Sequence, residues 1–109
     1  LLHRGLKFCA SMGITAVQTN DSKQLGGISD AWAVYSALAD EEQLPCRVFL
    51  TVSCLDLGSK GTPQVPVVHQ SGLLSCDRVK LWTDGALGAG TAALIEPYSD
   101  DPGNVGILQ

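Results

Sequence analysis

Three short apolar segments recur at nearly equal spacing along the chain. They cover residues 14–18, 47–51 and 79–82, so their starts lie 33 and 32 positions apart. Each segment is mostly apolar without strict alternation, which is typical of parallel strands covered on both faces. Because parallel neighbours need a long crossover between them, the spacing predicts repeated βαβ units. The three strands are expected to lie parallel and adjacent, in sequence order, with right-handed connections.

The segments between these strands differ in how clearly they predict helices. Residues 1–12 carry apolar side chains at helical spacing, and Gly13 is placed to end that helix. Ser29 is a suitable N-cap for a second helix that runs to about Gln43. Glycines and prolines interrupt the last connection, so a loop followed by one short helix near 66–76 is expected there.

The end of the chain, residues 84–109, has no clear periodic element and is rich in glycine and proline. Long loops of this kind in compact domains are usually functional or disordered, and the apolar stretch 91–95 argues against disorder. Three parallel strands with one covering helix each would also leave two open sheet edges, which is a liability. The sequence therefore predicts a slice of a larger α/β domain.

Composition and charge exclude several classes of protein. The chain is 45% hydrophobic and 17% charged, which indicates a packed core and not a disordered segment. Its formal net charge is −4, and it has no run of Lys or Arg that could follow a phosphate backbone, so nucleic-acid binding is excluded. No apolar stretch approaches the ~20 residues of a membrane span.

The cysteines and the start of the chain bear on its cellular environment. Four cysteines are present, none with CxxC spacing or a nearby histidine, so reduced thiols that pack as small hydrophobes are expected. No signal-peptide pattern is visible at the N-terminus, which favours a cytoplasmic location. His3 and His69 are isolated and fit structural or surface roles better than metal ligation.

Two charged residues in or after the third segment are candidates for function. Lys80 lies inside an apolar run, where a charge is costly unless it is neutralised or paired. The ordinary explanation is a lysine at a strand end, whose stem packs while the amine reaches water. Asp84 follows the carboxyl end of the strand, where active-site residues collect in parallel α/β domains, although Asp-Gly pairs also simply form turns.

The sequence Val-Lys-Leu-Trp-Thr-Asp-Gly-Ala-Leu-Gly at residues 79–88 resembles the signature of the amidohydrolase family 3 proteins. These are the relatives of N-substituted formamide deformylase within the metal-dependent amidohydrolase superfamily. Ala86 and Gly90 replace a serine and a frequent arginine of many relatives, so contacts from that loop are not transferred. The resemblance runs, in order, through residues 13–18, 44–48, 79–88, 91–94 and 97–103.

The resemblance implies a (β/α)8 barrel of TIM type with a small β-sandwich domain and one or two divalent metals at the mouth. In the superfamily the ligands are an HxH pair on the first strand, a carboxylated lysine on the fourth, histidines on the fifth and sixth, and an aspartate on the eighth. This chain has no HxH, and its strands would map to strands two to four. Residues 1–109 would then form a partial, incomplete barrel followed by a long loop.

In that alignment Lys80 falls at the position of the carboxylated lysine. A neutral lysine amine can add carbon dioxide to form a carbamate, which is an anionic oxygen ligand for a divalent cation, with zinc expected first. Asp84 is expected to contact substrate. No catalytic residue is expected within the chain, because the proton-shuttling aspartate of the family comes from the last strand.

The function implied by the resemblance is hydrolysis of non-peptide C–N bonds, in linear amides or formamides, by metal-activated water. The expected partners are a small-molecule amide and the remainder of the chain's own barrel, with a homo-oligomer also open; the 109 residues alone should be inactive. A truncated or degenerate paralogue that keeps only barrel packing is the alternative. A nucleotide-binding module ranks last, because neither glycine-rich stretch forms a phosphate loop.

Overall fold

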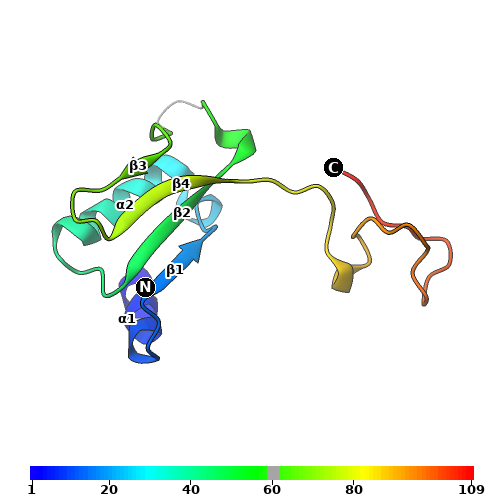
Figure 1. Cartoon of the computed structure of the whole chain (residues 1–109), viewed down its shortest axis with the longest axis horizontal. Helices are drawn as coiled ribbons and strands as arrows, with labels where there is room; N and C mark the ends of the chain where they lie inside the picture. The colour runs from blue at the N-terminus through cyan, green and yellow to red at the C-terminus, as the bar shows by residue number, and fades with distance from the viewer. Residues whose placement is uncertain (59–61) are drawn as a thin grey trace.

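Two helices and a four-stranded sheet, with short 3-10 turns, form the described part of the first 80 residues (Figure 1). The computed structural model describes residues 1–58 and 62–109. The helices are α1 (Leu2–Ser11) and α2 (Ile28–Asp40), and the strands are β1 (Ala16–Thr19), β2 (Arg47–Ser53), β3 (Val67–Val68) and β4 (Leu74–Lys80). Three short 3-10 turns complete the list: η1 (Lys23–Leu25), η2 (Cys54–Asp56) and η3 (Leu87–Ala89).

The sheet has the order β1-β2-β4-β3. β1 pairs with β2 in parallel, for example Val17 with Val48, and β2 pairs with β4 in parallel, for example Val48 with Leu74. This confirms the predicted set of three parallel strands, adjacent and in sequence order. Helix α2 forms the connection between β1 and β2, as the spacing of the segments predicts.

The predicted position of the third strand was wrong by several residues. β4 begins at Leu74 and ends at Lys80, whereas Leu81 and Trp82 lie outside the strand and are 65% and 55% exposed. The buried part of β4 is its beginning, where Leu74 and Cys76 are fully buried. Polar residues alternate with these two apolar ones, so the strand has a period of two and not the unbroken apolar run that was expected.

The short helix expected near 66–76 is also absent from the described structure. This region instead forms a hairpin in which β3 pairs antiparallel with β4. His69 closes its turn, because the His69 carbonyl accepts from Gly72 N–H (2.9 Å) and its Nδ1 accepts from Ser71 N–H (3.2 Å). The His69 Nε2 atom lies 3.3 Å from Asp40 Oδ1, which ties the hairpin to the end of α2. His69 is therefore structural, as the sequence suggested.

The helices match the prediction more closely. α1 agrees to within one residue at each end, and Gly13 adopts φ +82°, a conformation that favours glycine after a helix. α2 begins one residue before the predicted N-cap Ser29, with Gly27 at the N-cap position. It ends at Asp40 and not at Gln43, because Glu42 turns the chain with φ +56° and Gln43 N–H returns to the Leu38 carbonyl (2.8 Å).

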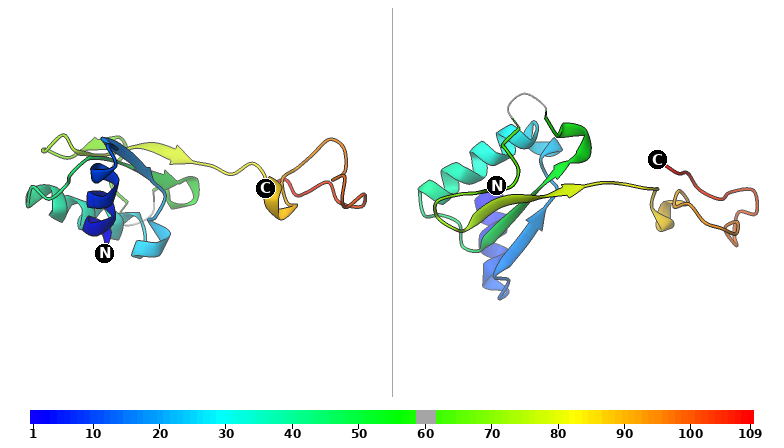
Figure 2. Two further views of the ribbon diagram at one scale, coloured as in Figure 1. Left: turned by 90° about the horizontal axis from the view of Figure 1, so that it is seen from below. Right: turned by 45° about the horizontal axis from the view of Figure 1, so that its top comes forward.

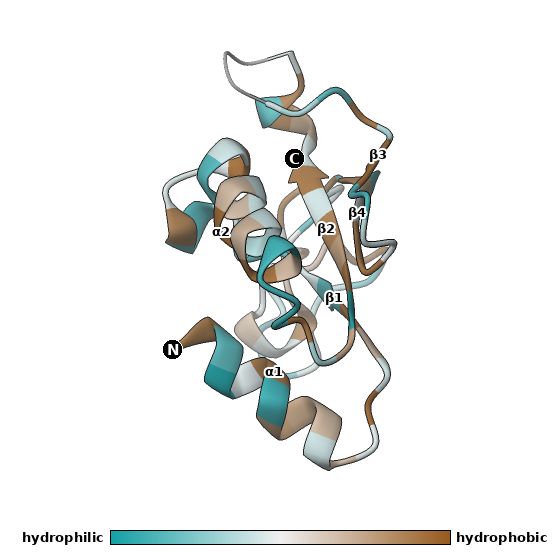
Figure 3. Ribbon diagram, turned by 90° about the vertical axis from the view of Figure 1, so that its left-hand side faces the viewer, coloured by the Kyte–Doolittle hydropathy of each residue, from teal (hydrophilic) through white to brown (hydrophobic). Residues whose placement is uncertain are grey.

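Both helices pack on the same side of the sheet (Figures 2 and 3). From β2, Val48, Leu50 and Val52 are each at most 1% exposed and pack in one cluster with Tyr35 of α2 and Leu6 of α1. No element covers the opposite face in the described part of the chain (Figure 2). We call this second face the open face.

The cysteines behave as the sequence predicts. All four are free, and Cys46 and Cys76 are buried within the apolar cluster. Burial raises the pKa of both thiols, which keeps them protonated and unreactive at neutral pH.

In the described part of the chain, no helix is both long enough and apolar enough to span a bilayer.

After Lys80 the chain leaves the sheet as an extended arm that ends in a folded loop (Figure 1). The radius of gyration is 17.4 Å, whereas a compact domain of this size has about 13 Å. The arm carries apolar side chains that are largely uncovered, such as Ile95 (99% exposed) and Leu108 (78%). The chain therefore exposes far more apolar surface than a compact domain of equal length.

The open face and the exposed arm predict how the 109-residue chain behaves when it is expressed alone. We expect a broad thermal transition by circular dichroism, binding of a hydrophobic dye, and association that rises with concentration in size-exclusion chromatography. These would indicate an aggregation-prone or molten state. A sharp, reversible two-state melt of a monomer would contradict the prediction.

Candidate functional site

The carboxyl ends of β1, β2 and β4 meet at one edge of the sheet, because the three strands are parallel. These ends are Thr19, Ser53 and Lys80, and Ser53 and Lys80 pair directly in register. Ligand sites in parallel α/β domains collect at this edge. The structure thus places Lys80 where the sequence predicts a functional residue.

A shift in the β2–β4 register decides which way Lys80 points. Leu50 pairs with Cys76, whereas the next residue, Thr51, pairs with Arg78, so Asp77 has no partner in the ladder. The additional residue reverses the alternation of side chains along β4. Without it, Lys80 would fall on the same side as Cys76, in the apolar cluster beneath the helices.

With this shift, the end of β4 turns its charged residues to the open face. Arg78 lies over the Phe49 ring, with its guanidinium carbon 4.6 Å from the ring centroid, and its Nε is 3.1 Å from Asp77 Oδ1. Lys80 is two residues further along the same face and pairs with Ser53. The open face therefore ends in a lysine at the carboxyl edge of the sheet.

Lys80 is half-buried and not enclosed in an apolar strand as its sequence neighbours suggested. Its Nζ lies 5.3 Å from the centroid of the Trp82 ring, so these two residues lie on one side of the chain. Within residues 1–58 and 62–109, no carboxylate lies within ion-pair distance of this amine. Contact with an aromatic ring leaves the nitrogen at the rim of the strand ends, accessible to a ligand.

Asp84, the second predicted site residue, lies at the start of the arm and has a clear structural contact. Its Oδ2 accepts from Ala93 N–H (3.1 Å), and its backbone forms an isolated bridge with Leu108. The loop is closely built at Gly106, which has φ +78° and would place a Cβ 1.9 Å from the Ala92 carbonyl oxygen. One carboxylate oxygen of Asp84 is thus engaged in holding the arm.

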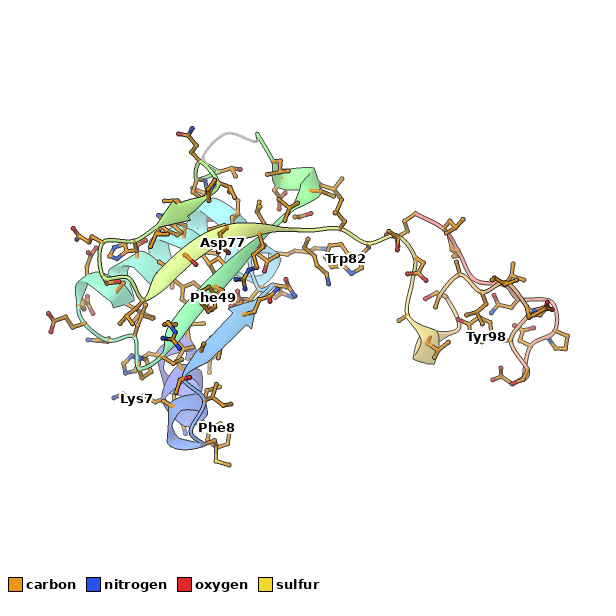
Figure 4. The ribbon with its side chains drawn as sticks, viewed as in Figure 1. Lys7, Phe8, Phe49, Asp77, Trp82 and Tyr98 are labelled. Carbon is orange, nitrogen blue, oxygen red and sulfur yellow. The ribbon has the colours of Figure 1, made fainter. Side chains whose placement is uncertain are left out.

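A pocket of about 500 Å³ opens at the same edge as Lys80, and no sequence pattern predicts it directly. It lies among the segments that follow β1, β2 and β4, with Trp82 on one side (Figure 4). The residues that matter for its chemistry are Asn20, Lys23, Ser53, Leu55, Asp56 and Trp82. The available signal was positional, since all of these residues except Trp82, which ends the third predicted strand, follow a predicted strand by a few positions.

A hydrogen-bonded group at the end of β1 holds the segment whose Asn20 and Ser22 line this pocket. Tyr35 OH donates to Asp21 Oδ2 (2.7 Å), and the Thr19 hydroxyl donates to Asp21 Oδ1. Burial, followed by the hydrogen bond to Asp21, raises the pKa of Tyr35, so the phenol remains a donor. The group links α2 to the segment after β1. Sequence reasoning missed it because Asp21 and Tyr35 are 14 positions apart.

The described residues contain no group of three or more His, Cys, Asp or Glu side chains that could hold a metal ion. Lys80 is the candidate ligand that the geometry of this part of the chain supports, since it lies at the strand ends, half-buried and facing the open side. A divalent cation bound here would need further ligands from other strands. Lys80 would supply one ligand of such a metal site, and the other ligands would come from elsewhere.

Comparison with known proteins gives a consistent result. The model of the amidohydrolase family matches residues 1–108. A Bacillus subtilis (strain 168) protein described as a putative amidohydrolase, YtcJ, is 30% identical over 97% of this chain and 20% of its own length. The crystal structure of an uncharacterized metal-dependent hydrolase from Pyrococcus horikoshii OT3 has a TM-score of 0.69 and 32% identity, over 98% of this chain and 21% of that chain. The chain therefore spans about a fifth of the length of these relatives.

Proposed function

The chain belongs to the amidohydrolase family, and we propose that it forms strands two to four of a (β/α)8 barrel. The complete barrel would hydrolyse linear amides or formamides with a bound divalent metal, for which zinc is the first candidate. The observation that carries this proposal is the position of Lys80. It stands at the carboxyl end of β4 and on the open face, which would be the barrel interior.

The uncovered surfaces of the fold support membership of a larger barrel. The open face, with Phe49 and Arg78, has no covering layer in the described part of the chain. An apolar groove of about 430 Å³ also lies beside β1, between α1 and η1, with Leu2, Leu6 and Val17 in its lining. A preceding βα unit would cover this groove and pair with the outer edge of β1, and a following strand would pair with the end of β4.

Lys80 would hold the metal through the carbamate of its side chain. A divalent cation at this edge would supply activation of water and polarisation of the substrate carbonyl. The amine contacts only an aromatic ring among the interactions found for it in the described part, so carbamate formation would break no ion pair there. Nearby, Ser53 is half-buried on the neighbouring strand and pairs with Lys80, so its hydroxyl would orient the carbamate.

The test uses a complete barrel, made by replacing the matching fifth of the Pyrococcus horikoshii hydrolase with this chain. Zinc per protein is measured by mass spectrometry, beside amide hydrolysis. We expect Lys80→Ala to lose tenfold or more of its metal affinity and to lose activity, because one anionic ligand is missing. Lys80→Arg should fail equally, since a guanidinium cannot form the carbamate. Bicarbonate with a short carboxylic acid should partly restore Lys80→Ala.

Lys7 provides the matched control, because it is an exposed lysine on α1 (Figure 4), and Lys7→Ala should keep its metal. Near-normal zinc content and turnover in Lys80→Ala would refute the proposed ligand. That result would favour a paralogue that keeps only the packing of the barrel.

The register shift allows a second test of the same proposal. Deleting Asp77 removes the residue that has no partner in the β2–β4 ladder, so Lys80 should turn from the open face toward the helices. We expect the deletion to lose metal as Lys80→Ala does, although the lysine itself is still present. Asp77→Ala keeps the number of residues and loses only a half-exposed contact with Arg78, so it should retain zinc. Equal zinc content in both variants would argue against the assigned direction of Lys80.

We further propose that Asp84 binds the substrate amide through the carboxylate oxygen that does not hold Ala93. Asp84→Asn keeps an acceptor for the Ala93 N–H and removes the charge, whereas Asp84→Ala removes both. If the charge binds substrate, KM should rise about tenfold or more in both variants. A normal KM in Asp84→Asn, with a defect only in Asp84→Ala, would show that the residue merely holds the arm.

A further inference from the structure

We propose that the pocket among the segments after β1, β2 and β4 receives an uncharged aryl group of the substrate, with Trp82 as the residue that determines this specificity. The inference rests on the proposed function, because it assigns the substrate class of the same site. It concerns residues outside the amide chemistry itself. Figure 4 shows Trp82 beside the point where the chain leaves the sheet and the arm begins.

The location of the pocket places it within reach of Lys80. Trp82 forms one wall of the pocket, and its ring centroid is 5.3 Å from Lys80 Nζ. A substrate whose amide lies near Lys80 would therefore extend its side group along the indole. The volume of about 500 Å³ falls in the range of pockets for small molecules and exceeds what a methyl or formyl group requires.

The side chains that line the pocket favour an aromatic group. Trp82 is 55% exposed and Leu55 is 87% exposed, so both present apolar surface that no other part of the described chain covers. A flat ring placed between them buries this surface and gains an offset stacking contact with the indole. Leu55 is held in place because its N–H donates to the Ser53 hydroxyl (3.3 Å).

The charges in the lining exclude a charged group. Lys23 and Asp56 both line the pocket, and no ion pair between them is found in the described part of the chain. A carboxylate on the substrate would be attracted by Lys23 and repelled by Asp56, and an ammonium would meet the reverse. Neither gains a net partner, yet each would lose solvation on entry. A neutral ring avoids this cost.

The walls of the pocket are fixed before a ligand arrives. On the β1 side, Asn20 and Ser22 line the pocket and flank Asp21, which is held by Tyr35 (2.7 Å) and by Thr19. On the β2 side, the Ser53 hydroxyl caps η2. A preformed pocket loses less conformational entropy on binding, so selectivity between aryl and alkyl groups should be visible in the affinity.

The experiment measures the binding of three amides, two neutral and one charged, to the complete barrel in which this chain replaces the matching fifth of the Pyrococcus horikoshii hydrolase. Its metal is removed so that no turnover occurs, and dissociation constants are obtained by calorimetry for acetanilide, 4-acetamidobenzoate and N-methylacetamide. We expect acetanilide to bind at least tenfold more tightly than the other two. Trp82→Ala should weaken acetanilide about tenfold and leave N-methylacetamide unchanged, whereas Trp82→Phe should keep most of the affinity.

Two further variants make the test independent of the folding of Trp82→Ala. Leu55→Ala changes a side chain that is 87% exposed and should weaken acetanilide severalfold. Asp56→Asn should improve binding of 4-acetamidobenzoate severalfold, because it removes the repulsion. Trp32→Phe, on α2, is the matched control and should change none of the three affinities.

The inference is overturned if the Trp82→Ala variant binds acetanilide as tightly as the unmodified barrel does. It is also overturned if this variant loses affinity for all three amides equally. Absence of acetanilide binding also overturns it. Hydrolysis by the zinc-loaded barrel is measured separately. If acetanilide binds through Trp82 but no amide is hydrolysed, the proposed function fails and the pocket assignment stands. If amides are hydrolysed without any dependence on Trp82, the reverse holds.

Discussion

The rest of the structure depends on the packing of β2. It is the strand with parallel partners on both sides, and Val48, Leu50 and Val52 are buried against the helices. Burial of three such side chains contributes several kcal/mol, on the order of 1.5–3 kcal/mol each. Because β1 and β4 are both aligned on this strand, their carboxyl ends are brought to one edge. Lys80 and the pocket are therefore close together because of the packing of this core, although neither is part of it.

The order of the parallel strands could be predicted because it follows from a long-range regularity, the even spacing of apolar segments. The bounds of β4 could not, because the part that is buried, Leu74 to Cys76, includes a serine and looks less apolar than the exposed Leu81 and Trp82. Apolar residues near a functional edge need not be core residues. The resemblance of residues 79–88 to the family assigned Lys80 to a barrel strand, and the structure has it as the last residue of β4, although the strand was predicted too late in the sequence.

The pocket and the hydrogen-bonded group after β1 lay beyond sequence reasoning for a different reason. Asp21 and Tyr35 meet only because α2 returns over the sheet, and Leu55 and Trp82 line one pocket only because β2 and β4 are neighbours. Such long-range juxtapositions have no local pattern that a single sequence reveals. The hairpin was missed for a simpler reason. A two-residue strand held by its turn, with His69 contacting Asp40, is too short to produce a periodic signal.

The single unpaired residue in β4 connects the fold to the chemistry. A regular strand that buries Leu74 and Cys76 would also direct Lys80 into the apolar cluster, where a charge is not tolerated. Because of the shift at Asp77, side chains at the beginning of the strand pack in the core, whereas Arg78 and Lys80 at its end lie on the open face. Trp82 follows Lys80 by two residues and contacts it, so the same shift also directs the indole toward the pocket. One additional residue thus separates core positions from the candidate functional position, Lys80, along seven residues of strand.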